Sequence, residues 1–285
     1  MKQNLPIGCH VSIAGGIWKA PERAKDLDCE TFQIFSRSPQ GGPAPKLDAE
    51  SILKFKEAIK LGAFERFVIH SPYYINFGST NPKIYHGSIT VIRQELERGS
   101  VLGSDYVMFH PGSLKDNPKG GVKYVIDGIK KVLDGYDGEC KMLIEISAGA
   151  GEVVGDSFEE LAELVDAIGN SIGFGGICFD TQHAFASGYD LRTDEAVTET
   201  FKKFDKQIGL DLLKMSHVND SKVEFGSKRD RHEHVGDGHI GKKGIGAVIN
   251  YFQKKKMDIP LILETEHDKV QIDIKLLKDL RDSKK

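Results

Sequence analysis

The sequence has little of what marks secreted, membrane-spanning or thiolate-metal proteins. Its four cysteines, Cys9, Cys29, Cys140 and Cys178, lie far apart and form no Cys-x-x-Cys pair. This favours reduced, buried thiols over a disulfide framework or a structural zinc site. The opening segment MKQNLPIGCHVS lacks the apolar core of a secretory signal, and no apolar run approaches the roughly 18 residues of a membrane span. We therefore expect a cytoplasmic protein without a membrane partner.

The chain also lacks a large charge excess of either sign. Its 39 lysines and arginines are balanced by 42 aspartates and glutamates, for a formal net charge of -3. A nucleic-acid binder with this balance needs its basic side chains gathered on one face. With 39% hydrophobic and 28% charged residues in a chain of 285, the composition is that of a globular protein with one large core. We expect a single domain over residues 1–285.

Eight short apolar runs recur along the whole chain. They begin at Ile7, Thr31, Arg66, Tyr106, Met142, Gly176, Leu212 and Pro260. Because they lack strict polar alternation, they are typical of strands that are covered on both faces, as in a parallel sheet.

The intervals between these runs carry apolar residues at helical spacing. The predicted helices span 17–27, 52–61, 89–102, 122–133, 158–168, 196–208, 245–252 and 270–280. Gly87-Ser88 and Asp156-Ser157 are predicted to begin two of them as N-caps. Eight strand–helix units predict a (β/α)₈ TIM barrel, with eight parallel strands inside and helices outside, and an open doubly wound sheet is the alternative.

Metal-binding residue types end most of the predicted strands, where a barrel of this kind places its active site. One histidine at a strand end is usually a hydrogen-bonded rim residue, but many histidines and carboxylates converging there are costly to bury without a cation. The candidates are His10, His70, His110, Glu145, Asp180, His217 and Glu264, with His183 just beyond the sixth strand and Asp230 and His232 in the long loop after the seventh.

This set of ligands indicates the metal and the chemistry. Imidazole and carboxylate ligands without thiolates favour zinc, with manganese as the alternative. The candidates exceed the three or four ligands of one catalytic zinc, so two or three ions are implied, with Glu145 as a bridging carboxylate. Paired cations activate water and neutralise charge on the attacking and leaving oxygens, which favours hydrolysis of a phosphodiester.

Longer motifs at these positions resemble the endonuclease IV family of apurinic/apyrimidinic endonucleases. They are GCHVSIAGG from Gly8, HSPYYIN from His70, HPGS from His110, FDTQHAFASGYDL from Phe179, HVNDSK from His217, DRHEHVGDGHIG from Asp230 and LILETE near the C-terminus. The resemblance covers essentially the whole chain. It implies a DNA-repair enzyme that hydrolyses the phosphodiester 5′ to an abasic site in duplex DNA and leaves a 3′-hydroxyl, with metal-bound hydroxide as nucleophile.

The resemblance also assigns roles to residues. It implies three zinc ions: His70, His110 and Glu145 hold the first, Glu145, Asp180, His217 and Glu264 the second, and His183, Asp230 and His232 the third. Glu145 and Glu264 are the expected catalytic carboxylates.

By the same resemblance, Tyr73 and Tyr74 match positions that enter the DNA minor groove. Arg37 or Gln40 is expected to act beside them from the loop SRSPQGGPAP, which departs from the Arg- and Trp-bearing form of the family. Ile146 and Gln182 stand where the family often has Asn and Cys, and loss of the Asn is expected to weaken the support of Glu145.

Two other functions fit parts of the pattern. A sugar isomerase or epimerase on the related xylose isomerase-like barrel needs only the second group, Glu145, Asp180, His217 and Glu264, whereas a trinuclear phosphodiesterase uses the other five ligands as well. A non-catalytic DNA-binding barrel does not need an intact ligand set. The sequence therefore favours a monomeric zinc enzyme acting on double-stranded DNA that contains abasic sites.

Overall fold

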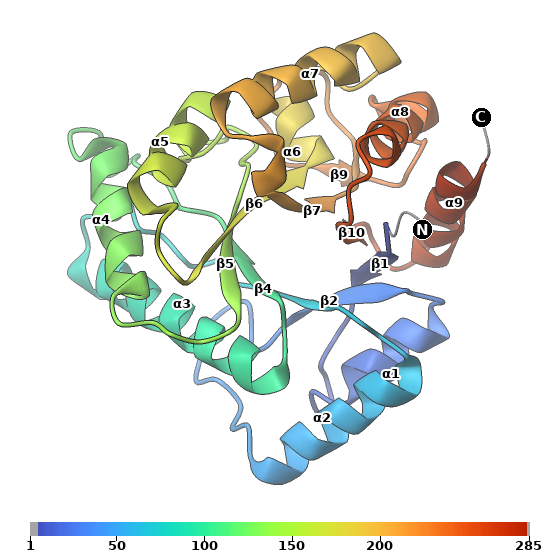
Figure 1. Cartoon of the computed structure of the whole chain (residues 1–285). Helices are drawn as coiled ribbons and strands as arrows, with labels where there is room; N and C mark the ends of the chain where they lie inside the picture. The colour runs from blue at the N-terminus through green and yellow to red at the C-terminus, as the bar shows by residue number, and fades with distance from the viewer. Residues whose placement is uncertain (1–4, 284–285) are drawn as a thin grey trace.

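Eight parallel strands close into a barrel in the computed structural model, which describes residues 5–283 (Figure 1). Around the barrel the strands follow the order β1-β10-β7-β6-β5-β4-β3-β2, and β1 pairs with both β2 and β10 to close it. Their bounds are β1 (Ile7–His10), β2 (Thr31–Phe35), β3 (Val68–His70), β4 (Tyr106–Phe109), β5 (Lys141–Glu145), β6 (Phe174–Asp180), β7 (Leu213–His217) and β10 (Leu261–Leu263). The TIM barrel prediction is confirmed, and the open sheet is excluded.

The helices lie around the strands, as Figure 1 shows. They are α1 (Lys19–Asp26), α2 (Ala49–Gly62), α3 (Pro82–Leu102), α4 (Gly121–Leu133), α5 (Phe158–Ile168), α7 (Asp194–Gln207), α8 (Gly241–Lys254) and α9 (Val270–Asp282). Each contains or overlaps one predicted helix. Within residues 5–283 no helix is long and apolar enough to cross a membrane.

One of the two predicted helix starts is correct. Ser157 caps α5, because its side chain accepts a hydrogen bond from the backbone N–H of Glu160. The predicted start at Gly87-Ser88 is wrong, since α3 begins at Pro82 with Asn81 as its N-cap. The Ser88 hydroxyl instead donates back to the carbonyl of Ile84 within the helix, which lets a serine lie inside it.

Four short elements were not predicted: α6 (Thr181–Ala186), the 3-10 helix η1 (Leu210–Leu212), β8 (Asp220–Ser221) and β9 (His232–Glu233). The last two pair antiparallel and join the two ends of the long loop that follows β7. The α6 helix directly continues β6. The α6 helix and the β8–β9 pair both follow the carboxyl ends of strands and therefore shape that end of the barrel.

The barrel interior has an apolar layer beneath a polar one. The apolar layer, here called the lumen floor, consists of the fully buried side chains of Val68, Met108, Leu143, Cys178, Met215 and Ile262. Side chains two residues apart in a strand point to the same face. The residues two positions further on, His70, His110, Glu145, Asp180, His217 and Glu264, therefore point into the same lumen above the floor.

Candidate metal centre

A cavity of about 460 Å³ opens above this polar layer, at the carboxyl ends of the strands. Its walls include ligand candidates from six strand ends or the loops that follow them, among them His70, His110, His183 and Glu264. Tyr73 stands at its rim, with most of its side chain exposed. The cavity thus joins the buried polar layer to solvent.

Six of the nine ligand residues that the resemblance implies line this cavity, and the other three, Glu145, Asp180 and His217, are fully buried beside them. Four groups have ligand atoms within 4.8 Å of one another: His70, His110 and Glu145; Glu145, Asp180, His217 and Glu264; Asp180, His183 and His232; and Glu145, Cys178 and His217, which adds a thiol of the lumen floor to members of the second group. The carboxylate of Asp230 lies 3.5 Å from His183 Nε2 and 3.4 Å from His232 Nε2. Glu145 links the first two groups, and Asp180 links the second to the third. The link through Asp180 was not predicted from the sequence.

The contacts of Glu145 show that these groups fit a cation. This carboxylate is fully buried, and its Oε2 has no hydrogen-bond partner among the described residues. The Nε2 atoms of His110 and His70 nevertheless lie 3.1 and 4.0 Å from it. A buried carboxylate oxygen without a donor costs free energy that a metal ion between these atoms would remove.

The histidines and carboxylates of the centre stabilise each other's charged forms. Burial alone would raise the pKa of Glu145, but His110 and His217 hold it well below its usual range. Burial likewise opposes the charging of His183, yet Asp180 and the other nearby carboxylates raise its pKa well above the ordinary value. Without metal, protons therefore occupy nitrogen atoms at which a cation would bind, and metal binding must displace them.

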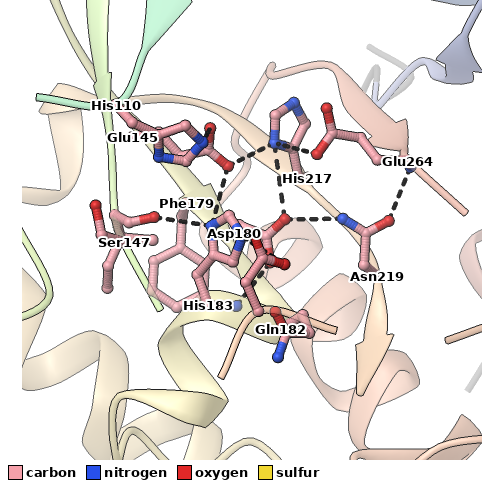
Figure 2. A network of polar contacts seen from close by, with 12 residues as sticks. His110, Glu145, Ser147, Phe179, Asp180, Gln182, His183, His217, Asn219 and Glu264 are labelled. Atoms are coloured by element: carbon pink, nitrogen blue, oxygen red, sulfur yellow. Dashed lines mark hydrogen bonds and ion pairs between the residues drawn. The ribbon is translucent and has the colours of Figure 1, made fainter. Parts of the chain in front are cut away.

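Side chains and carbonyls outside the ligand groups orient their members. The Asn219 amide donates to Asp180 Oδ2 at 2.8 Å and accepts from the backbone N–H of Glu264 at 2.8 Å (Figure 2). His183 Nδ1 donates to the carbonyl of Ile146 at 3.0 Å. Because that bond uses the main chain, a residue other than Asn at position 146 keeps it.

Gln33 and Gln182 also support the centre from buried positions. The Gln33 amide lies between His217 and Glu264, within 2.8 Å of both. The Gln182 side chain donates to the carbonyl of Arg229 at 2.9 Å and so holds the loop that carries Asp230. Gln33 and Asn219 were not predicted as site residues, although an amide inside the apolar run TFQIF was a usable signal.

Comparison with known proteins identifies the family of the chain. Residues 21–283 match the family described as xylose isomerase-like TIM barrel. A protein of Halothermothrix orenii named probable endonuclease 4 is 39% identical over 264 residues, which are 92% of this chain and 93% of the relative. One of the same name from Nitrosopumilus maritimus is 40% identical over 267 residues, 93% of this chain and 94% of the relative. The chain belongs to the endonuclease IV family.

Two solved structures are similar to this chain over nearly its whole length. The crystal structure of endonuclease IV from Thermus thermophilus has a TM-score of 0.85 and 32% identity, covering 96% of this chain and 98% of that one. A D-tagatose 3-epimerase-like protein has a TM-score of 0.74 at 21% identity, covering 96% of each chain. The second likeness concerns the fold alone.

The residues expected to contact DNA in this member of the endonuclease IV family lie in two adjoining loops. The side chains of Tyr73 and Tyr74 are 69% and 37% exposed, and Gln40 is exposed in the loop after β2. The backbone N–H of Tyr73 donates to the carbonyl of Pro39, which ties the two loops together. Tyr73 also packs edge-on against Phe35, with ring centroids 5.1 Å apart.

Arg37 does not belong to this exposed set, and the burial of its side chain argues against the expected role in DNA contact. Its side chain is only 4% exposed and donates from Nε to Glu95 of α3 at 2.6 Å and from Nη2 to Gln94 at 3.0 Å. The fully buried carboxylate of Glu95 requires a cationic partner, and Arg37 supplies it. The residue therefore anchors the loop after β2.

Proposed function

We propose that this chain is a DNA-repair endonuclease that hydrolyses the phosphodiester 5′ to abasic sites in duplex DNA and leaves a 3′-hydroxyl. The observation that carries the proposal is the convergence of nine His and carboxylate ligand candidates, six in the walls of one cavity and three buried beside them. Five of them, His70, His110, His183, Asp230 and His232, exceed what a sugar isomerase needs. Membership of the endonuclease IV family supports the same conclusion.

The ligand groups would hold three zinc ions, with manganese as an alternative in some sites. Bound there, the ions would lower the pKa of water and offset the charge on the phosphate oxygens. Two carboxylates of the protein would have different roles. Glu145 is fully buried and would serve as the shared ligand, whereas Glu264 lines the cavity and is placed to accept a hydrogen bond from a water molecule that enters it.

Recognition of the abasic site would use the exposed tyrosine and the cavity together. A sugar without a base has lost its stacking, so extruding it from the duplex costs less than flipping an intact nucleotide. Tyr73 exposes its ring at the cavity rim, where it can enter the minor groove and fill the vacated space in the stack. In this proposal the chain acts as a monomer.

The test is incubation of the purified chain with a duplex that contains one abasic site, with and without a strong chelator, alongside zinc analysis. We expect chelator-sensitive incision 5′ to the site and about three zinc ions per chain. His110→Ala is expected to lose the activity, whereas the matched variant His86→Ala, an exposed histidine of α3, keeps it. Conversion of a ketose without incision, or one bound ion after zinc loading, contradicts the proposal.

A further inference from the structure

Gln33 is a fully buried amide in the wall of the barrel next to the ligand candidates. On β2 the neighbouring side chains of Phe32 and Ile34 belong to the core between strands and helices. Because side chains alternate along a strand, Gln33 points the other way, into the lumen. The large majority of buried polar side chains are hydrogen-bonded, so the partners of Gln33 indicate what holds it there.

Three active-site groups satisfy the amide of Gln33. Its Oε1 lies 2.8 Å from His217 Nε2, and its Nε2 lies 2.7 Å from Glu264 Oε1 and 3.1 Å from His10 Nδ1. The orientation of the amide is fixed by chemistry, because a carboxylate oxygen can only accept. Both amide hydrogens are therefore used, and the amide oxygen is left to accept from the imidazole.

This orientation determines which nitrogen of His217 keeps its proton when the ring is neutral, as it must be to bind a metal. If Nε2 donates to Gln33, the lone pair of the neutral ring lies on Nδ1. That atom points to the polar layer, 2.7 Å from Glu145 Oε1, 3.3 Å from Glu264 Oε2 and 3.7 Å from Asp180 Oδ2. A neutral ring with its lone pair among three carboxylates is arranged to bind a cation.

We propose that Gln33 is a positioning residue of the metal centre, which sets the tautomer of His217 and the orientation of Glu264 through one amide. This inference rests on the proposed metal-dependent function. It extends that function by naming a residue that contacts two ligands and is not itself one. Two ligands from β7 and the end of β10 are thereby held by a single side chain of β2.

The experiment measures zinc retention by competition with a chromophoric chelator, on the purified full chain. Gln33→Met keeps the length of the side chain and removes its hydrogen bonds. Loss of such an outer partner typically weakens metal binding about 10- to 100-fold, so we expect zinc to leave Gln33→Met at correspondingly lower chelator concentration. Cobalt substituted for zinc is expected to show altered visible bands, a change that a purely structural role would not produce.

Two further variants complete the design. Gln33→Glu keeps an oxygen facing His217 but places a second one against Glu264, so zinc retention is expected to fall here also, and this variant serves if Gln33→Met does not fold. Gln253→Leu removes a side-chain amide that donates to the carbonyl of Arg281, away from the ligand candidates, and wild-type retention is expected. Wild-type zinc retention and cobalt bands in either Gln33 variant would overturn the proposal.

The same experiment separates this proposal from the proposed function. If the wild-type chain retains zinc and loses it on Gln33 substitution, but does not incise abasic DNA, the function fails and the role of Gln33 stands. If incision occurs and the Gln33 variants retain zinc normally, the role fails and the function stands. Absence of bound zinc in the wild-type chain refutes both and is measured first.

Discussion

Replacing Glu95 by leucine is expected to destabilise the protein far more than replacing an exposed glutamate of the same helix. Glu95 is fully buried, and its two carboxylate oxygens accept from Arg37 Nε and Ser36 Oγ, both at 2.6 Å. The substitution leaves the guanidinium of Arg37 buried with Gln94 as its remaining side-chain partner. Breaking a buried ion pair in this way costs about 3–5 kcal/mol.

This cost converts to a measurable change in melting temperature. With about 2.1 cal/mol/K of unfolding entropy per residue, a chain of 285 residues has an unfolding entropy of about 0.6 kcal/mol/K. A loss of 3–5 kcal/mol then lowers Tm by about 5–8 °C, which circular dichroism resolves easily. The double variant Arg37→Leu/Glu95→Leu is expected to regain most of the loss, because it removes both charges.

The matched control is Glu97→Leu, on the same helix. Glu97 is 58% exposed and pairs with Arg93 at 3.0 Å, so its loss is expected to cost less than about 1 kcal/mol. Glu95→Leu is also expected to raise KM for abasic duplex, since Arg37 anchors the loop that contacts Tyr73. A fall in Tm no larger than that of Glu97→Leu, or a double variant as unstable as the single one, would refute the reasoning.

Three further predictions concern the mouth of the barrel. Tyr73→Ala is expected to lower kcat/KM for abasic duplex about tenfold, the size of one lost base–aromatic contact, with zinc content unchanged by elemental analysis. Asp220→Asn is expected to lower the free energy of unfolding by about 2 kcal/mol in denaturant titrations. The reason is that this buried carboxylate accepts from the backbone N–H groups of Gly236, Gly238 and Ile240, among others. Wild-type stability of the variant would contradict the view that Asp220 stabilises this loop. Zinc affinity is expected to rise with pH near neutrality. Burial lowers the pKa of both His183 and His217, but nearby carboxylates raise the pKa of His183, and Cys178 and Glu264 raise the pKa of His217, by more. Zinc must therefore displace two protons, which gives up to about a hundredfold per pH unit in chelator competition, and a pH-independent affinity would contradict it.

The strands and most helices could be predicted because their signals are local. A strand buried on both faces carries a continuous apolar run, so the eight runs locate the eight barrel strands within about two residues. A predicted strand boundary is displaced where glycines interrupt the apolar run. The predicted run starts at Gly176, but β6 begins at Phe174, before Gly175 and Gly176. Most ligand candidates could be found because they stand at the end of such a run or just after it.

Features that depend on distant partners could not be predicted. The burial of Arg37 is decided by Glu95, 58 residues away, and the sequence around Arg37 is that of an exposed loop. The α6 helix is only six residues long and buried throughout, so it has no amphipathic period to detect. Its N-cap is Asp180, whose Oδ1 accepts from the backbone N–H of His183 at 2.8 Å. The Asp-x-x-His spacing is therefore that of a helix cap, which places two ligand candidates together.

The lumen floor closes the candidate metal centre from below. Its six side chains are fully buried and lie directly below the layer that contains Glu145 and His217. The cavity lined by Tyr73 and His232 is therefore the route by which water, chelator and metal ions are expected to reach and leave these residues. A bound duplex would cover the same mouth, so DNA and chelator would compete for one passage. Ions already inside would exchange slowly for as long as the DNA remained bound.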